Sequence, residues 1–178
     1  MTTTPAPREI AAEPIDAARY AAYGALVRAG PAHAARSANH DTAEAWDALA
    51  LLENMRGADA RCTASLFRCR AYAASEIPIR WLERHADSTQ MFVPMRAARY
   101  LVIVATGGER PDLATLAAFV VEGAQAITYA PGTWHHPMIA LVEDAEFVNV
   151  IFTDGSARDC DEIAYDVAPA VVVVAAAT

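Results

Sequence analysis

The sequence predicts a mainly β fold, a barrel or sandwich with a few short helices. From Arg61 onward, short runs rich in β-branched and aromatic residues alternate with turn residues, which is typical of successive strands. The runs have similar spacing, and this favours a sandwich or barrel over a parallel βαβ sheet. A length of 178 residues is usual for one domain, so we expect residues 1–178 to form a single domain.

The strands expected in this part of the chain follow one another closely. They lie near residues 62–72, 78–84, 89–94, 99–105, 124–129, 138–142 and 146–153. The segment 111–121 interrupts the series, because Asp112 is a suitable N-cap and Leu113, Leu116 and Phe119 would share one face of a helix. We therefore expect a helix over 111–121.

The first 60 residues carry a weaker pattern. Residues 16–23 favour a short helix that ends at Gly24. The alanine-rich stretch 42–52 fits either a second helix or a flap. We therefore expect residues 1–60 to be a mixed, helix-tending N-terminal part of the same domain.

The chain ends in an apolar tail, residues 168–178. Its apolar stretch has about half of the ~20 residues that a membrane span needs, so we expect no membrane partner. On a monomer the tail would leave an exposed apolar patch, and such patches usually mark interfaces. We therefore expect the tail to pair with the sheet edge of a second copy in a homodimer.

Composition excludes several classes of function. All 14 basic residues are arginine, and the absence of lysine excludes Schiff-base and lysine-nucleophile chemistry. The net charge of −8 argues against nucleic acid as a partner. Cys62, Cys69 and Cys160 are an odd set without the spacing of a metal site, which fits free thiols in a reducing compartment. Because the N-terminal residues also lack the pattern of a secretory leader, we expect a cytoplasmic protein.

Two segments carry candidate acid and base groups. In the first, strand alternation places Glu83 and His85 on one face and Arg84 on the other. A carboxylate beside an imidazole is a suitable acid/base pair. In the second, a turn precedes His135 and His136, which would point in opposite directions along an extended chain. One of these two histidines is therefore expected at a functional site.

Several motifs together resemble the ureidoglycolate lyase family. Their order and spacing match over about residues 62–164. The motifs are Leu82-Glu83-Arg84-His85, Gln90-Met-Phe-Val-Pro-Met95, Arg110-Pro-Asp-Leu113, Ala118-Phe119 and Tyr129 through Gly132-Thr-Trp-His-His-Pro-Met138. The resemblance implies a cupin-like β-barrel, usually a homodimer, that cleaves ureidoglycolate into glyoxylate and urea in purine and allantoin breakdown.

Such a reaction breaks the C–N bond of a carbinolamide that carries a carboxylate. It needs a base for the hydroxyl proton, a proton donor for the departing urea nitrogen and a group that binds the carboxylate, a role that suits arginine. We expect no cofactor and no metal. The catalytic candidates are Glu83, His85, His135 and His136. The candidates for binding this small-molecule substrate are Arg84, Gln90, Arg96, Tyr129 and Trp134.

Two other classes of function stay open. Glu83, His85 and one of His135 or His136 would also form a set of two histidines and one carboxylate, as in a metal-dependent cupin enzyme. A non-catalytic protein that binds small anions is the third interpretation, because Ala45 stands where the family usually has an arginine. Elemental analysis and a turnover assay distinguish the three classes.

Overall fold

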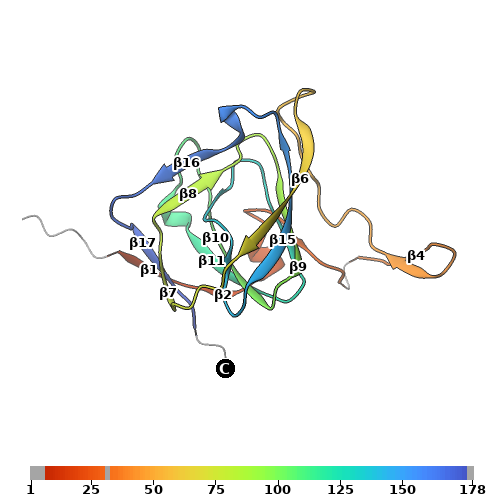
Figure 1. Ribbon diagram of the computed structural model, residues 1–178, viewed down its shortest axis with the longest axis horizontal. Helices are drawn as coiled ribbons and strands as arrows, with labels where there is room; N and C mark the ends of the chain where they lie inside the picture. The colour runs from red at the N-terminus through yellow and green to blue at the C-terminus, as the bar shows by residue number, and fades with distance from the viewer. Residues whose placement is uncertain (1–6, 31–32, 176–178) are drawn as a thin grey trace, which may run out of the picture.

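Three β-sheets packed in layers form the body of the molecule, and a two-stranded hairpin projects from it (Figure 1). The computed structural model describes residues 7–30 and 33–175. The strands are β1 (Arg8–Ala11), β2 (Glu13–Pro14), β3 (Leu26–Val27), β4 (Arg36–Ala38), β5 (Ala43–Ala45), β6 (Arg61–Cys69), β7 (Glu76–Pro78), β8 (Trp81–Arg84), β9 (Gln90–Arg96), β10 (Arg99–Ala105), β11 (Ala117–Glu122), β12 (Ala126–Tyr129), β13 (Trp134–His135), β14 (Ile139–Ala140), β15 (Ala145–Thr153), β16 (Asp161–Ala164) and β17 (Ala170–Val173). The helical elements are α1 (Ala17–Tyr20) and the 3-10 turns η1 (Leu113–Thr115) and η2 (Ala157–Asp159). Among the described residues, no helix has the length and apolar character needed to cross a membrane.

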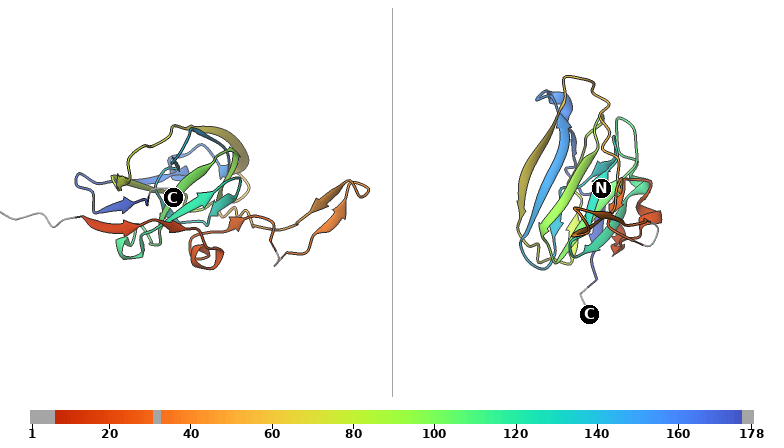
Figure 2. Two further views of the ribbon diagram at one scale, coloured as in Figure 1. Left: turned by 90° about the horizontal axis from the view of Figure 1, so that it is seen from below. Right: turned by 90° about the vertical axis from the view of Figure 1, so that its right-hand side faces the viewer.

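The central sheet has an apolar core on each of its faces. Its strand order is β16-β8-β13-β10-β11-β2, and β14 also pairs with β10. One face packs against the sheet β1-β17-β7. The other face packs against α1 and the sheet β3-β12-β9-β15-β6, whose strands β9, β15 and β6 lie side by side in Figure 2.

Strand β10 shows how alternation builds both cores. Leu101 and Ile103 belong to the core shared with β7 and β17, whereas Tyr100, Val102 and Val104 belong to the core shared with β9 and β15. Successive side chains of a strand point to opposite faces. Because both faces are covered, β10 is a continuous apolar run.

The prediction of a mainly β fold, a barrel or sandwich with a few short helices, is confirmed. The helix expected over 111–121 is wrong. Only η1, capped by the side chain of Asp112, precedes β11, and residues 118–121 are buried. A short apolar run that is buried on both faces has no periodicity to distinguish a strand from a helix.

The N-terminal part is closely attached to the central layers. The short helix expected over 16–23 is confirmed as α1, and the side chain of Asp16 caps it by accepting a hydrogen bond from the Arg19 N–H. Gly24 lies so close to β12 that a Cβ would be 1.8 Å from the carbonyl oxygen of Thr128.

Residues 42–52 form no helix; they contain β5, and the hairpin β4–β5 extends away from the body (Figure 2). An isolated helix of this length is only marginally stable in water, and the described chain offers this segment no neighbouring layer against which a helix would pack.

The apolar tail is part of the core, which corrects the interface expected from it. Strand β17 lies between β1 and β7 of its own chain. Ala170, Val172 and Val174 are 1%, 0% and 8% exposed. Within residues 168–175, the tail therefore offers no exposed apolar patch from which a homodimer can be argued. Residues 176–178 of the tail lie outside the described residues.

Candidate active site

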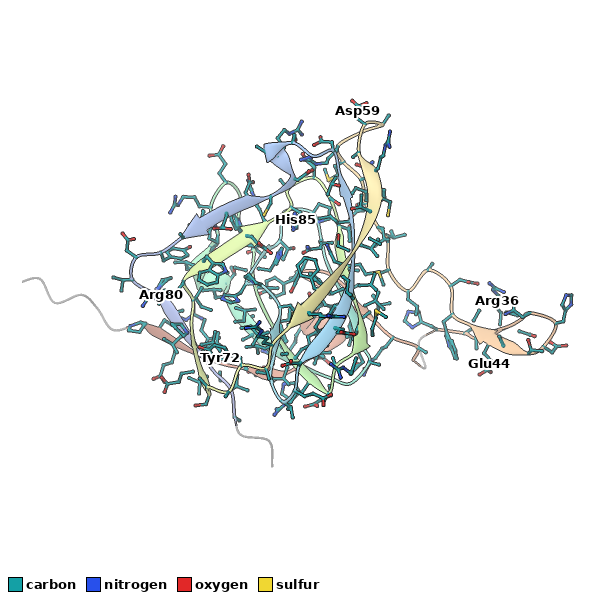
Figure 3. The ribbon with its side chains drawn as sticks, in the orientation of Figure 1. Arg36, Glu44, Asp59, Tyr72, Arg80 and His85 are labelled. Atoms are coloured by element: carbon teal, nitrogen blue, oxygen red, sulfur yellow. The ribbon has the colours of Figure 1, made fainter. Side chains whose placement is uncertain are left out.

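Strand β8 presents an acid and a base to the space between the central sheet and the sheet that contains β9 and β15. Glu83 and His85 face this space, and Figure 3 places His85 between the two sheets at the end of β8. Arg84 points to the opposite face, where its guanidinium lies 4.9 Å from the ring centre of Trp134 and its Nε donates to Asp161 over 2.8 Å. The alternation predicted for Glu83, Arg84 and His85 is therefore confirmed.

His135 completes a cluster of three titratable groups. In the register of β8 and β13, His135 lies directly opposite Glu83, and its Nε2 is 3.3 Å from Glu83 Oε1. One ligand atom from each of Glu83, His85 and His135 lies within 4.8 Å of the others. The turn before β13 helps to position them, because Gly132, with φ of 79°, donates its N–H to the carbonyl of His85.

Main-chain carbonyls orient both imidazoles of the cluster. Nδ1 of His85 lies 2.6 Å from the carbonyl oxygen of Asp159, and Nδ1 of His135 lies 3.1 Å from that of Thr133. A carbonyl can only accept, so each Nδ1 carries a proton and donates it. Each Nε2 is therefore left to act on the interior of the site. Nε2 of His135 is buried without a hydrogen-bond partner in the described chain and lies 3.3 Å from the carboxylate of Glu83.

Polar side chains of three further strands continue the site across the facing sheet. The ring of Tyr129 stacks on His135 with centroids 4.0 Å apart. Gln90 is the cross-strand neighbour of Tyr129, and Asn149 lies diagonally across from Gln90 on β15. Within the described chain, His85 Nε2, Tyr129 OH, Gln90 Oε1 and Asn149 Oδ1 are buried and have no hydrogen-bond partner. Buried polar atoms are normally paired, so these atoms mark a place for a polar ligand.

Burial shifts the pKa values at the site in directions that suit proton transfer. Burial raises the pKa of Glu83, but its interaction with His135 and the charge of His85 outweigh this effect, so the pKa lies below its ordinary value. Burial lowers the pKa of His85, although the hydrogen bond to Asp159 opposes the shift. Burial raises the pKa of Tyr129 well above its ordinary value, so its hydroxyl remains a donor. At neutral pH the site thus holds a carboxylate beside a neutral, basic imidazole.

The buried imidazoles predict a loss of stability in mild acid. Burial lowers the pKa values of His85 and His136 below the 6.5 of an exposed histidine. The unfolded chain therefore takes up these protons at a higher pH than the folded protein does, and the free energy of unfolding should fall as the pH is lowered from about 7.5 to about 5.5. Urea denaturation at several pH values measures this slope. The double variant His85→Gln/His136→Gln should show a flatter slope, and a flat wild-type profile would contradict the prediction.

The other histidine, tryptophan and arginine candidates are not members of the cluster. His136 stacks on Trp81 with ring centroids 5.5 Å apart, and its Nδ1 donates to the carbonyl of Pro137 over 2.9 Å. Trp134 is 1% exposed in the core on the far face of the central sheet. Arg96 is exposed at the end of β9, six residues and roughly 20 Å along the strand from Gln90. The structure thus brings His135 into the cluster. His136 lies beside it, near enough for its charge to affect the pKa of Glu83, whereas Arg84, Arg96 and Trp134 lie elsewhere.

Asn149 is a site residue that the sequence analysis missed. It is 5% exposed and lies on the same face of β15 as Phe147 and Ile151. A polar amide at an inward position of an alternating strand was the available signal. Such a residue needs a partner, which a polar ligand can supply.

The cluster also fits a divalent metal ion. Two imidazole nitrogens and one carboxylate oxygen form a donor set that several transition metals accept. The hydrogen bonds from Nδ1 of His85 and His135 to carbonyls leave Nε2 as the ligand atom, which is the usual arrangement around metal-binding histidines. Residues Glu83, His85 and His135 would hold the ion.

Comparisons with known proteins show the family to which this chain belongs. The sequence model of the family described as "Ureidoglycolate lyase" matches residues 7–173. The ureidoglycolate lyase of Azotobacter vinelandii is 34% identical over 155 residues, which are 87% of this chain and 91% of the relative. The ureidoglycolate lyase of Salmonella typhimurium is 34% identical over 148 residues, which are 83% of this chain and 89% of the relative. Among solved structures, a dTDP-4-dehydrorhamnose 3,5-epimerase from Elizabethkingia anophelis has a TM-score of 0.42 and 10% identity, with 79% of this chain and 80% of the other covered. The family match over almost the whole chain and the two curated relatives show that this protein belongs to the ureidoglycolate lyase family.

Proposed function

We propose that the protein is an enzyme that cleaves ureidoglycolate into glyoxylate and urea, as the names of its relatives indicate. The observation that carries this proposal is the convergence of Glu83, His85 and His135 on one buried space. Breaking a carbinolamide requires one proton to leave oxygen and one to reach nitrogen. A neutral imidazole and a protonated imidazole paired with a carboxylate supply these two functions.

His85 and His135 have different parts in the proposed mechanism. Nε2 of His85 takes the proton of the substrate hydroxyl, and the electron pair left on oxygen forms the aldehyde C=O of glyoxylate. The C–N bond breaks, and its electrons pass to the nitrogen of the departing urea. His135 delivers a proton to this nitrogen, while Glu83 stabilises its charged form across 3.3 Å. The net transfer is one proton from oxygen to nitrogen, and each transfer contributes roughly 10²–10⁴-fold.

The substrate carboxylate and ureido group need neutral donors in this arrangement, because Arg84 and Arg96 lie elsewhere. The hydroxyl of Tyr129 and the amides of Gln90 and Asn149 are the polar groups that line the facing sheet. We propose that they bind the carboxylate and the ureido group. The protonated state of Tyr129, whose pKa burial raises, suits a donor to a carboxylate.

The test of the proposed function is glyoxylate release from ureidoglycolate by the purified protein. Glu83→Gln keeps the size of the side chain and removes its charge, so the protonated form of His135 loses its partner. We expect kcat to fall at least about tenfold with the melting temperature nearly unchanged. Saturable binding of ureidoglycolate without turnover in the wild-type protein would support the non-catalytic interpretation instead, and an unchanged kcat in Glu83→Gln would remove Glu83 from the mechanism.

Metal-assisted cleavage is the second candidate function, and the donor set of Glu83, His85 and His135 favours it. A bound ion would polarise an oxygen of the substrate, so that the hydroxyl proton could be removed by a weaker base. Elemental analysis of purified protein, followed by activity measurements with a chelator and with added metal, distinguishes this mechanism from the metal-free one. Stoichiometric metal and chelator-sensitive turnover would favour the ion.

Assembly and location are predictions that accompany this function. The three cysteines, Cys62, Cys69 and Cys160, are free thiols, which supports a cytoplasmic location. A homodimer stays a prediction from the family resemblance alone, because β17 is used within the chain. A mass measurement in solution tests it directly.

A further inference from the structure

A buried arginine lies behind His85. The side chain of Arg56 is 2% exposed, and its Nη1 lies 2.8 Å from Asp154 Oδ1 and 2.6 Å from Asp159 Oδ1. Asp159 is also the residue whose main-chain carbonyl lies 2.6 Å from Nδ1 of His85. A single residue, Asp159, therefore connects the guanidinium to the proposed base.

The carboxylate of Asp159 anchors the loop that carries this carbonyl. It accepts hydrogen bonds from the N–H groups of Asp154, over 3.1 Å, and Gly155, over 2.8 Å. Asp159 is the last residue of η2, where a main-chain carbonyl has no partner inside the helical turn. The main-chain carbonyl of Asp159 is therefore free to accept a hydrogen bond from His85. The anchored carboxylate of Asp159 keeps this carbonyl pointing toward His85.

Arg56 is in turn fixed to the loop that follows His85. The N–H of Met55 donates to the carbonyl of Asp87 over 2.8 Å, and the N–H of Thr89 donates to the carbonyl of Glu53 over 3.0 Å. Glu53 also donates its N–H to Thr89 Oγ1 over 3.0 Å. The segment 53–56 thus holds Arg56 between the loop that follows His85 and the loop that contains Asp154 and Asp159.

We propose that Arg56 is a positioning residue of the lyase reaction, which acts through Asp159 to hold His85 in the tautomer with the proton on Nδ1. The inference rests on the role proposed above for His85. Without Arg56, two carboxylates face each other with no cation between them, and the loop of Asp159 relaxes. His85 then loses its carbonyl acceptor and also adopts the tautomer with the proton on Nε2, which cannot accept the hydroxyl proton.

Replacement of Arg56 by methionine tests the proposal, because methionine keeps the buried stem and removes the charge. We expect kcat to fall roughly tenfold to 100-fold, as a misplaced catalytic group usually causes. KM should change less than about twofold, since Arg56 is not expected to touch the substrate. In ¹⁵N NMR spectra, His85 should show protonated Nδ1 in the wild-type protein and a mixture of tautomers in Arg56→Met. Arg56→Lys keeps a cation between the carboxylates and should recover a large part of kcat.

The matched control is Arg158→Met. Arg158 also joins these two loops, through an ion pair of 2.7 Å with Asp87, but it is exposed and does not contact the carboxylate of Asp159. We expect its kcat and its His85 spectrum to resemble those of the wild-type protein. Equal losses in the two methionine variants would show a general effect of loop stability and overturn the proposal.

Asp159→Asn and His85→Ala are the further variants of this test. If Arg56→Met does not fold, Asp159→Asn weakens the same anchor with almost no change of shape, and wild-type kcat and His85 signals in that variant would overturn the inference. If His85→Ala is inactive while Arg56→Met is fully active, the positioning role fails and the proposed function stands. A fully active His85→Ala would instead remove the proposed role of His85.

Discussion

Replacement of either His85 or His135 by alanine is expected to lower kcat for glyoxylate release by roughly 10²-fold or more, because each imidazole performs one proton transfer. Both imidazoles have a buried Nε2 with no hydrogen-bond partner in the described chain, and that of His135 lies 3.3 Å from the Glu83 carboxylate. KM should change less than kcat, since the proposed binding groups lie on the facing sheet. Steady-state kinetics with folded protein, verified by circular dichroism, measure both quantities.

His136→Ala is the matched control for this prediction. His136 is 8% exposed and adjacent in sequence to His135, but it stacks on Trp81 and is not part of the cluster. Its replacement should lower the melting temperature and leave kcat within a few-fold of the wild-type value. Equal losses of kcat in His135→Ala and His136→Ala would show that the two histidines share a structural role, and would remove His135 as the proton donor.

Strand alternation was sufficient to predict which face of β8 carries the chemistry, but not which histidine of β13 joins it. Glu83, Arg84 and His85 follow the period of two, so their faces could be assigned from sequence. Strand β13 consists of Trp134 and His135 only, and His136 lies just beyond it. The choice between the histidines depends on the pairing of His135 with Glu83, which is a long-range contact that local periodicity does not contain.

The arginines show a similar limit. The sequence makes Arg84 and Arg96 candidates because an arginine suits a carboxylate, but Arg84 packs on Trp134 and Arg96 lies at the far end of β9. Arg56 carried no local signal, because its partners Asp154 and Asp159 are about a hundred residues away along the chain. Composition can therefore suggest that an arginine takes part in a site, whereas only the fold decides which arginine has buried partners.

The second large expected effect is a loss of folding stability when the C-terminal tail is removed. Deletion of the residues after Pro169 is expected to prevent stable folding, because it removes the strand between β1 and β7. The side chains of Ala170, Val172 and Val174 leave the core, and Ile10, Ile77 and Ile79 lose the cover that packs against them. Each buried valine contributes about 1.5–3 kcal/mol, and the main-chain pairing on both sides of β17 is lost as well. The total approaches the roughly 5–15 kcal/mol by which a domain of ordinary size is stable.

Two threonine variants separate this role from a contact between subunits. Val172 is 0% exposed, whereas its neighbour Val171 lies on the other face of β17 and is half-buried. Threonine has nearly the shape of valine, so Val172→Thr should cost about 1–3 kcal/mol for a buried hydroxyl, and Val171→Thr should cost much less. Urea denaturation gives both values, and the mass in solution is measured on the same samples. If the deletion variant folded with an unchanged melting temperature and only its mass fell from that of a dimer to that of a monomer, the tail would be an interface strand and its place between β1 and β7 would be wrong.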